Sequence, residues 1–134
     1  MESRFATVPL KLEDSRISYQ RLAAGFRQPF GHRHSRQEEL CVVVGRSARA
    51  KLDDEVELKR WDAVRVPPRT VRQFEAGPEG AEILAFGAPN TGASLAADQN
   101  RCRTGGPIET ARVRFGRLEV TNSAGGGCLS PGRW

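Results

Sequence analysis

The sequence predicts an all-β domain, built as a sandwich or a barrel. Three observations favour this fold class: apolar and polar residues alternate in runs of about five residues, turn-forming residues separate these runs at short intervals, and no segment has the period of an amphipathic helix. A chain of 134 residues has the length of one domain. Closing such a sheet into a barrel would remove its exposed edges.

Alternation indicates the strands in the first part of the chain. Residues 8–10 predict a short leading strand, and residues 17–19 predict the next one. The segment 32–34 is the third, and an apolar run over 40–44 follows it. This run has no polar break, which is typical of a strand that is covered on both faces.

The later strands are separated by clear turn residues. Asp53-Asp54 predicts a turn between the first two of them. Pro67-Pro68 ends the third, because proline lacks the N–H group that a sheet requires. A Gly- and Pro-containing segment, 76–80, predicts a turn between the last two. The expected strands cover residues 48–52, 56–58, 63–66, 70–75 and 82–86.

Residues 90–134 differ in composition from the preceding part of the chain. Gly, Ser, Thr, Asn and Arg dominate them, and apolar residues are too few to offset the entropy of ordering. We therefore expect a barrel domain over residues 1–89, followed by a mostly disordered, Gly/Arg-rich tail. One weak hairpin is expected in this tail, because Val113 and Val120 lie on either side of Gly116-Arg117.

Both histidines of the chain lie two residues apart, just before a pair of glutamates. On a strand, His32 and His34 point to the same face. Either Glu38 or Glu39 then follows within reach. Two imidazoles and a carboxylate on one concave face can hold a divalent metal and leave positions open for water or substrate. Such a spacing also arises by chance, so the spacing alone is weak evidence.

The segment 25–45 resembles the first motif of the cupin family, G-x5-H-x-H-x3–4-E-x6-G. Two registers fit this motif. With Glu38 as the carboxylate, Gly45 closes the motif; with Glu39, Arg46 stands where the closing glycine belongs. The Glu38 register is preferred. In the Glu39 register Cys41 would join the pocket as a soft ligand, although a small buried hydrophobe is the more frequent role of such a cysteine.

The segment 61–74 is similar in shape to the second cupin motif, G-x5-P-x-G-x2-H-x3-N. Pro67 matches, whereas Trp61 and Arg69 stand at the two glycines and Arg72 stands at the histidine. Arg69 would then adopt a positive φ at a cost of about 1 kcal/mol, or the turn is rebuilt. The resemblance covers residues 16–88 and implies a small double-stranded β-helix, or jelly-roll, barrel.

The family resemblance implies three histidines and one glutamate in a metal-binding cupin, so Arg72 is the main departure. A guanidinium stays protonated and has no lone pair to donate. In one alternative, His32, His34 and Glu38 hold Fe, Mn, Ni or Zn, and Arg72 binds an anionic substrate. In the other, slightly favoured, Arg72 pairs with Glu38 and replaces the cation. Phe74 shares a face with Arg72 and is expected either to line a ligand pocket with it or to pack in the core.

These expectations lead to two functional hypotheses. The first is a small-molecule-binding cupin without established catalysis. The alternative is a metal-dependent enzyme of the dioxygenase or isomerase type that acts on a small anionic metabolite. The resemblance also implies a homodimer.

Composition limits the partners and the location. The formal net charge is +5, but no basic helix or basic stripe with interleaved aromatic residues accompanies it, so we predict no nucleic-acid partner. No apolar run is long enough to span a bilayer, which predicts no membrane association. Three widely spaced cysteines and the lack of an apolar N-terminal segment predict a cytoplasmic location.

Overall fold

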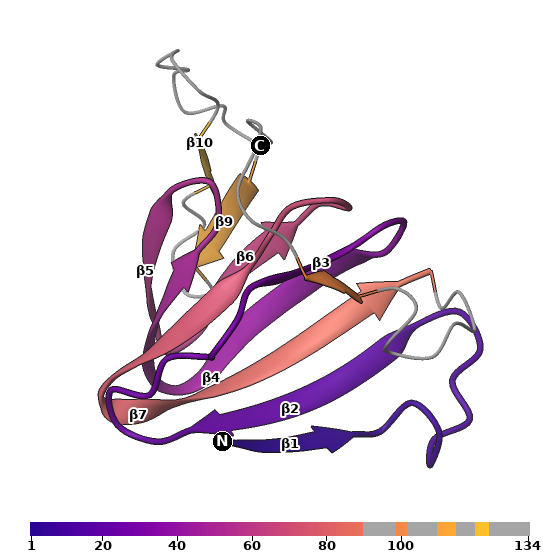
Figure 1. Cartoon of the computed structure of the whole chain (residues 1–134), viewed down its shortest axis with the longest axis horizontal. Helices are drawn as coiled ribbons and strands as arrows, with labels where there is room; N and C mark the ends of the chain where they lie inside the picture. The colour runs from indigo at the N-terminus through magenta and orange to yellow at the C-terminus, as the bar shows by residue number, and fades with distance from the viewer. Residues whose placement is uncertain (90–98, 102–109, 115–119, 124–134) are drawn as a thin grey trace.

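The computed structural model describes residues 1–89, 99–101, 110–114 and 120–123. Every regular element within these residues is a β-strand (Figure 1), and all pairings between the strands are antiparallel. The all-β fold class is thereby confirmed. No helix in this part of the chain has the length and hydrophobicity needed to cross a membrane.

The described strands follow the predicted alternation closely after residue 15. The leading strand lies at residues 2–5 rather than at 8–10, because residues 7–11 form a turn. The strands are β1 (Glu2–Phe5), β2 (Arg16–Leu22), β3 (His32–His34), β4 (Glu38–Lys51), β5 (Glu55–Lys59), β6 (Asp62–Val66), β7 (Gln73–Ala88), β8 (Gln99–Arg101), β9 (Thr110–Arg114) and β10 (Val120–Ser123).

The gap between the expected strands 40–44 and 48–52, and the predicted turn over 76–80, are bulges inside long strands. β4 continues through Gly45, and β7 continues through the segment 76–80, because the two strands remain paired along almost their whole length. The pairing shifts between Val43 and Gly45, and again between Arg46 and Ala48. A bulge bends a strand without ending it. The prediction of a turn over 76–80 is therefore wrong, and one curved strand replaces two short ones.

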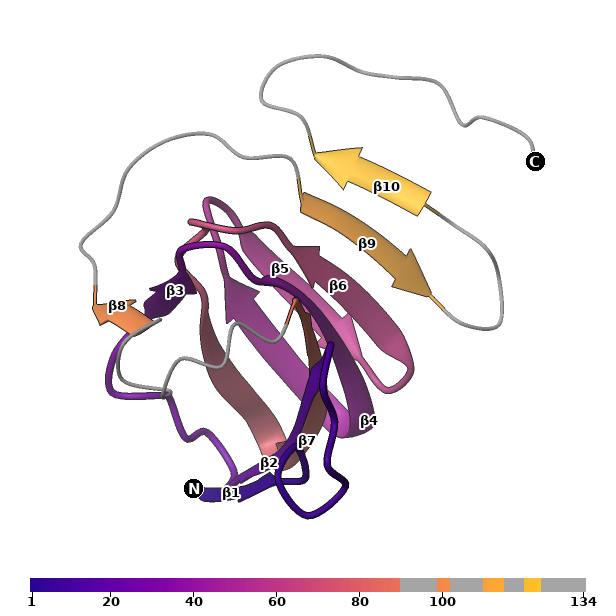
Figure 2. The same cartoon turned by 90° about the vertical axis from the view of Figure 1, so that its right-hand side faces the viewer.

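The long strands form the centre of a sheet that curls around an interior. The strand order is β1-β2-β7-β4-β6-β9-β10, and β5 pairs with the far end of β4. β3 pairs with β8 in a second, smaller sheet, which lies apart from the main sheet in Figure 2. A bridge between His32 and Arg72 joins β3 to the residue just before β7. In this bridge each backbone N–H donates to the other residue's carbonyl oxygen, at 3.1 and 2.9 Å.

The interior of the curled sheet is an apolar core. Alternation along β4 determines which side chains reach it: Cys41 is 1% exposed and Val43 is fully buried, whereas Leu40 is 40% exposed. Successive residues of a strand point to opposite faces, so the odd-numbered residues of this stretch face inward. The core consists of Leu22, Cys41, Val43, Ala48, Ala50, Leu52, Leu58, Val64, Val66, Phe74, Ala76, Ala81, Ile83 and Ala85.

Three described strands lie within the predicted tail. β9 pairs with β10 so that Val113 is opposite Val120, which is the hairpin that the sequence predicts. β9 also pairs with β6 and extends the main sheet. The rest of residues 90–134, and with it most of the predicted disorder, lies outside the described residues.

Among the described residues, four that are not glycine lie in the left-handed backbone region: Lys11, with a φ of 53°, and three more. Arg46 has a φ of 63°, Trp61 a φ of 68° and Arg69 a φ of 70°. These are the positions at which the cupin motifs have glycine, provided that Glu39 is the carboxylate of the first motif. The expectation of a positive φ at Arg69 is confirmed. A side chain in this region costs about 1–2 kcal/mol relative to the right-handed form.

Candidate functional site

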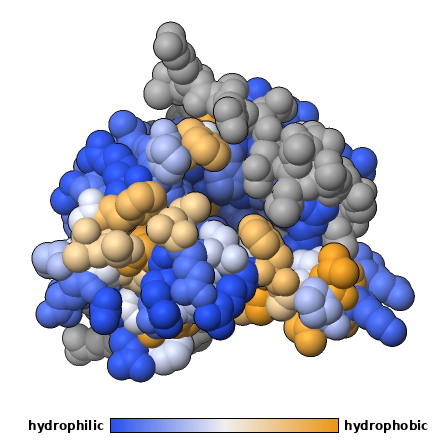
Figure 3. All heavy atoms as spheres, turned by 60° about the horizontal axis from the view of Figure 1, so that its bottom comes forward, coloured by the Kyte–Doolittle hydropathy of each residue, from blue (hydrophilic) through white to orange (hydrophobic). Residues whose placement is uncertain are grey.

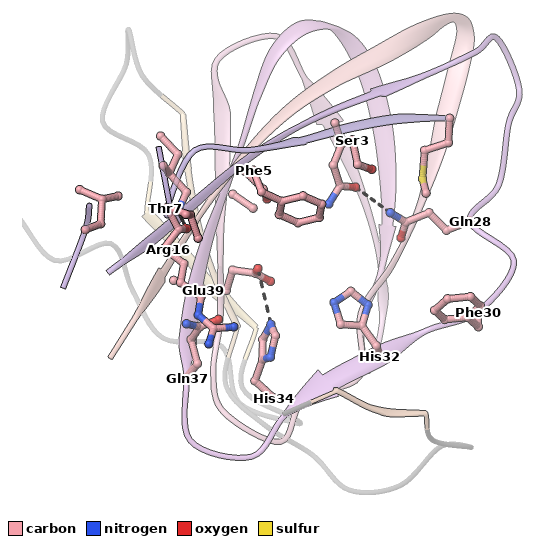
Figure 4. A pocket seen from close by; sticks show the side chains of 18 of the residues that line it. Ser3, Phe5, Thr7, Arg16, Gln28, Phe30, His32, His34, Gln37 and Glu39 are labelled. Carbon is pink, nitrogen blue, oxygen red and sulfur yellow. Dashed lines mark hydrogen bonds and ion pairs between the residues drawn. The ribbon is translucent and has the colours of Figure 1, made fainter. Parts of the chain in front are cut away.

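A cavity of about 780 Å³ lies between the N-terminal strands and β3 (Figure 4). β1, β2, β3, the loop after β1, the loop before β3 and the start of β4 contribute to its wall. Hydrophobic residues gather on the face at the bottom of Figure 1, including the end where the loop after β1 lies (Figure 3). The volume is within the range of about 300–1,000 Å³ that is typical of small-molecule sites.

The first two strands turn polar side chains toward this cavity. Ser3 of β1 is paired with Gln20 of β2, and Phe5 with Ser18, and all four residues line the cavity. Tyr19, between the two polar residues of β2, does not line it. It is unusual for a strand to turn its polar face toward the interior of a barrel, and such a face indicates a ligand site. The alternating residues of β2 could have revealed this from the sequence.

The most buried charges of the site belong to Arg72 and Glu39, which we call the inner pair. The Arg72 Nη2 atom lies 2.5 Å from Glu39 Oε2, and the two side chains are 2% and 14% exposed. Arg72 Nη1 also approaches the His32 carbonyl oxygen, at 3.4 Å. The structure thus brings the arginine of the second motif onto the carboxylate of the first.

The neighbouring residue, Glu38, belongs to a different pair on the other face of β4. Its Oε2 atom lies 2.5 Å from Arg65 Nη2, and the side chains are 46% and 50% exposed for Arg65 and Glu38. We call this the outer pair. The preference for Glu38 as the site carboxylate is therefore wrong, because the alternation of β4 sends Glu39 inward and Glu38 outward. The alternative register, with Glu39, is the one that the structure adopts.

Both predicted histidines face the inner pair. His34 is 4% exposed, and its Nε2 atom lies 3.7 Å from Glu39 Oε1. The rings of His32 and His34 are edge to face, with centroids 5.5 Å apart. The backbone is fixed by the bridge to Arg72 and by the Arg69 N–H, which donates to the His34 carbonyl oxygen at 2.7 Å. Figure 4 shows both imidazoles and Glu39 directed into the cavity.

The charges of this group compensate one another. Burial and the nearby Arg72 guanidinium lower the pKa of His32 from 6.5 to about 4, so this imidazole is neutral at pH 7. Burial raises the pKa of Glu39, but the Arg72 guanidinium and the contact with His34 outweigh burial, and the pKa is lowered below its ordinary value. Glu39 is thus a carboxylate, and its charge is balanced by Arg72.

These residues do not fit a bound metal ion as they are arranged. Metal binding needs several lone-pair donors that converge on one point. In residues 1–89, 99–101, 110–114 and 120–123, no group of three or more His, Cys, Asp or Glu side chains is arranged to hold a metal. The carboxylate that would bind a cation already contacts the Arg72 guanidinium.

Phe74 and Cys41 both lie in the core, which is one of the two alternatives that the sequence leaves open for each of them. Phe74 is 4% exposed and packs in the apolar cluster, and it does not line the 780 Å³ cavity. Cys41 is 1% exposed and belongs to the same cluster. Burial and the neighbouring Glu39 carboxylate raise the pKa of its thiol well above the ordinary value. A thiol that keeps its proton is a poor metal ligand.

Comparisons with known proteins find similarity in structure alone. No protein-family model matches the chain, and no curated protein matches its sequence. A cupin protein from Bacteroides fragilis is similar with a TM-score of 0.63 and 21% identity, over 77% of this chain and 90% of that one.

Oxalate decarboxylase of Bacillus subtilis is similar as well. One variant of it gives a TM-score of 0.62 at 18% identity, over 75% of this chain and 27% of the decarboxylase chain. A second structure of this enzyme, whose subject is its Mn(II) centres, gives a TM-score of 0.61 at 18% identity. This chain thus matches only 27% of the length of the decarboxylase chain.

Proposed function

The chain has the cupin fold, and we propose that it is a small-molecule-binding cupin in which Arg72 takes the place of a metal ion. The observation that carries this proposal is the inner pair. Its guanidinium stands at the motif position of the third histidine and lies 2.5 Å from the site carboxylate. A cation that is part of the protein is therefore present beside Glu39, which lines the cavity.

Electrostatics support a site without metal. A divalent ion at Glu39 would have to displace Arg72, whose side chain is 2% exposed. Removing one partner from a buried pair leaves an uncompensated charge, at a cost of about 3–5 kcal/mol. The positive charge of Arg72 would also repel an incoming ion.

A metal-dependent enzyme is the second candidate function. It is favoured by the arrangement of His32, His34 and Glu39, which all line the same cavity. This candidate needs Arg72 to move away from Glu39. Oxalate decarboxylase, which is similar in structure, has Mn(II) centres. This similarity supports the candidate but assigns no metal to this chain.

Elemental analysis distinguishes the two candidates. The protein is purified without a histidine tag, dialysed, and then incubated separately with Fe(II), Mn(II), Ni(II) and Zn(II). We expect metal contents far below one ion per chain in every case. A content near one ion per chain, lost in His34→Ala, would overturn the proposal in favour of the metal-dependent enzyme.

The role of Arg72 is tested by a matched pair of substitutions. Arg72→His removes the guanidinium and adds a third imidazole beside Glu39, so metal uptake should rise toward one ion per chain. Arg65→His makes the same change in the outer pair, and it should leave uptake at the wild-type level. Unchanged uptake in folded Arg72→His would contradict the assignment of Arg72 to the position of the cation.

The predicted homodimer and cytoplasmic location remain predictions. The outer face of the sheet offers an apolar contact surface, because Leu40 of β4 is paired with Phe86 of β7 and each is 40% exposed. Light scattering coupled to gel filtration measures the oligomeric state, and a Leu40→Glu variant tests whether this surface is used.

A further inference from the structure

The cavity wall changes from apolar at its exposed side to polar at its buried side. Four apolar residues of the wall are strongly exposed: Val8 at 84%, Met1 at 61%, Phe5 at 50% and Phe30 at 45%. Exposed apolar residues around a cavity are typical of a surface that a ligand covers. By contrast, His34 and Glu39, which also line the cavity, have side chains that are only 4% and 14% exposed.

The buried side offers no uncompensated charge to a ligand. Glu39 lines the cavity, and the Arg72 guanidinium 2.5 Å away neutralises its charge. Of the cationic residues of the wall, Lys11 is exposed to water and Arg16 already has a partner. A carboxylate or an ammonium group would therefore be buried here without a counter-charge, which is unfavourable.

Neutral hydrogen-bonding groups are nevertheless available on the wall. Gln28 is fixed by the Phe74 N–H, which donates to its Oε1 atom at 3.0 Å. In turn, Gln28 Nε2 donates to Gln20 Oε1 at 2.8 Å (the upper dashed line in Figure 4). Among the described residues, the Gln20 amide nitrogen donates to none. The ring nitrogens of His32, which also lines the cavity, add further hydrogen-bonding groups.

We propose that the ligand of this cavity is an uncharged amphiphile. Its neutral polar head, a carboxamide or an alcohol, binds to Gln20 and His32, and its apolar body extends past Phe5 and Phe30 toward the exposed side. This inference rests on the proposed metal-free binding function and adds the chemical class of the ligand. A site without a free charge selects against carboxylates, the class that an unpaired Arg72 would bind.

A displacement assay with matched head groups tests the ligand class. The reporter is N-phenyl-1-naphthylamine, an uncharged dye whose fluorescence rises in apolar surroundings. The competitors are decanamide, 1-decanol, decanoate and decylamine, which share a ten-carbon chain and differ in charge. We expect decanamide and 1-decanol to displace the dye at concentrations about tenfold lower than the two charged compounds, because a buried unpaired charge is costly.

Substitutions at the two adjacent glutamates sharpen the test. Glu39→Gln leaves Arg72 without a counter-charge, so decanoate should gain affinity relative to decanamide. Glu38→Gln is the matched control in the exposed outer pair, and it should keep the wild-type preference. If Glu39→Gln does not fold, Gln20→Leu replaces it: dye binding should persist, while decanamide weakens about fivefold through the lost hydrogen bond.

The outcomes separate this inference from the function on which it rests. Displacement by decanoate or decylamine at concentrations as low as for decanamide would overturn the ligand class and leave a metal-free binding site intact. Failure of the wild-type protein to bind the dye would overturn the ligand class as well, since an open apolar cavity is part of it. Metal uptake by the wild-type protein would instead overturn the proposed function.

Discussion

Two arginine–glutamate pairs lie on opposite faces of strand β4, one residue apart. The inner pair, Arg72 with Glu39, and the outer pair, Arg65 with Glu38, have the same closest distance of 2.5 Å. They differ in exposure: 2% and 14% for the inner side chains, 46% and 50% for the outer ones. Pairs with the same closest distance therefore have unequal energies, because water screens one pair and is excluded from the other.

The largest expected difference concerns loss of the arginine. Arg72→Met should lower the free energy of unfolding by about 3–5 kcal/mol, because Glu39 is left buried without a partner. Arg65→Met should lower it by less than about 1 kcal/mol, since Glu38 is solvated. Urea denaturation followed by circular dichroism measures both values. Equal losses would mean that burial does not set the energies of the two pairs.

The second difference is that the stability of the protein depends on pH through His32, which lies near the inner pair. The pKa of His32 is about 4 in the folded chain and 6.5 in the unfolded one. The unfolded state therefore binds more protons between these values, and stability falls as the pH decreases through this range. Between pH 7.5 and pH 5 the loss is about 2 kcal/mol.

Three denaturation series at the two pH values check this dependence. His32→Gln, which cannot be protonated, should abolish most of the loss. Arg65→Met should retain it, because the outer pair does not contact His32. A loss of wild-type size in His32→Gln would assign the pH dependence to another group.

A smaller effect is expected in the turn that precedes the inner arginine. Arg69 has a φ of 70°, so Arg69→Gly should relieve the strained backbone. The gain in the free energy of unfolding is up to about 1 kcal/mol, because the flexibility of glycine offsets part of the relief. The same change at Arg65, in the extended strand β6, should instead destabilise the protein by about 1 kcal/mol. Thermal denaturation of both variants measures whether stability rises in Arg69→Gly and falls in Arg65→Gly.

The smallest net change is expected when both members of the inner pair are replaced. Arg72→Met combined with Glu39→Leu removes both buried charges, so no unpaired charge is left in the interior. Its free energy of unfolding should lie within about 1 kcal/mol of the wild-type value. A double variant as unstable as Arg72→Met alone would show that packing, rather than charge, explains the loss.

The sequence predicted the strands well but could not decide which face of β4 points inward. Leu40 and Val42 on one face are as apolar as Cys41 and Val43 on the other, so alternation fits both registers. The choice of Glu38 relied on Gly45, which stands where the family motif has its closing glycine. In the structure Arg46 takes that position instead, with a φ of 63°. The match of the chain to the first motif therefore shifts by one residue, from Glu38 to Glu39.

Other parts of the site depend on contacts that no local pattern encodes. The histidines and Arg72 were found because the two motifs preserve their spacing. For Phe74 the sequence could not decide between pocket and core, because sharing a strand face with Arg72 does not fix its depth in the barrel. The N-terminal wall was missed because Ser3 and Phe5 gain their meaning only when β1 pairs with β2. Likewise, the turn expected over 76–80 is a bulge because β4 continues beside it.

The left-handed residues Arg46, Trp61 and Arg69 have a consequence for how such chains are detected. A signature written in residue letters asks for glycine at these three positions and rejects the chain. A signature written in backbone dihedral angles accepts it, because the angles are those that glycine would adopt. Divergent barrels of this kind are therefore better searched for by the conformation of their turns, with the amino acids there treated as free to vary.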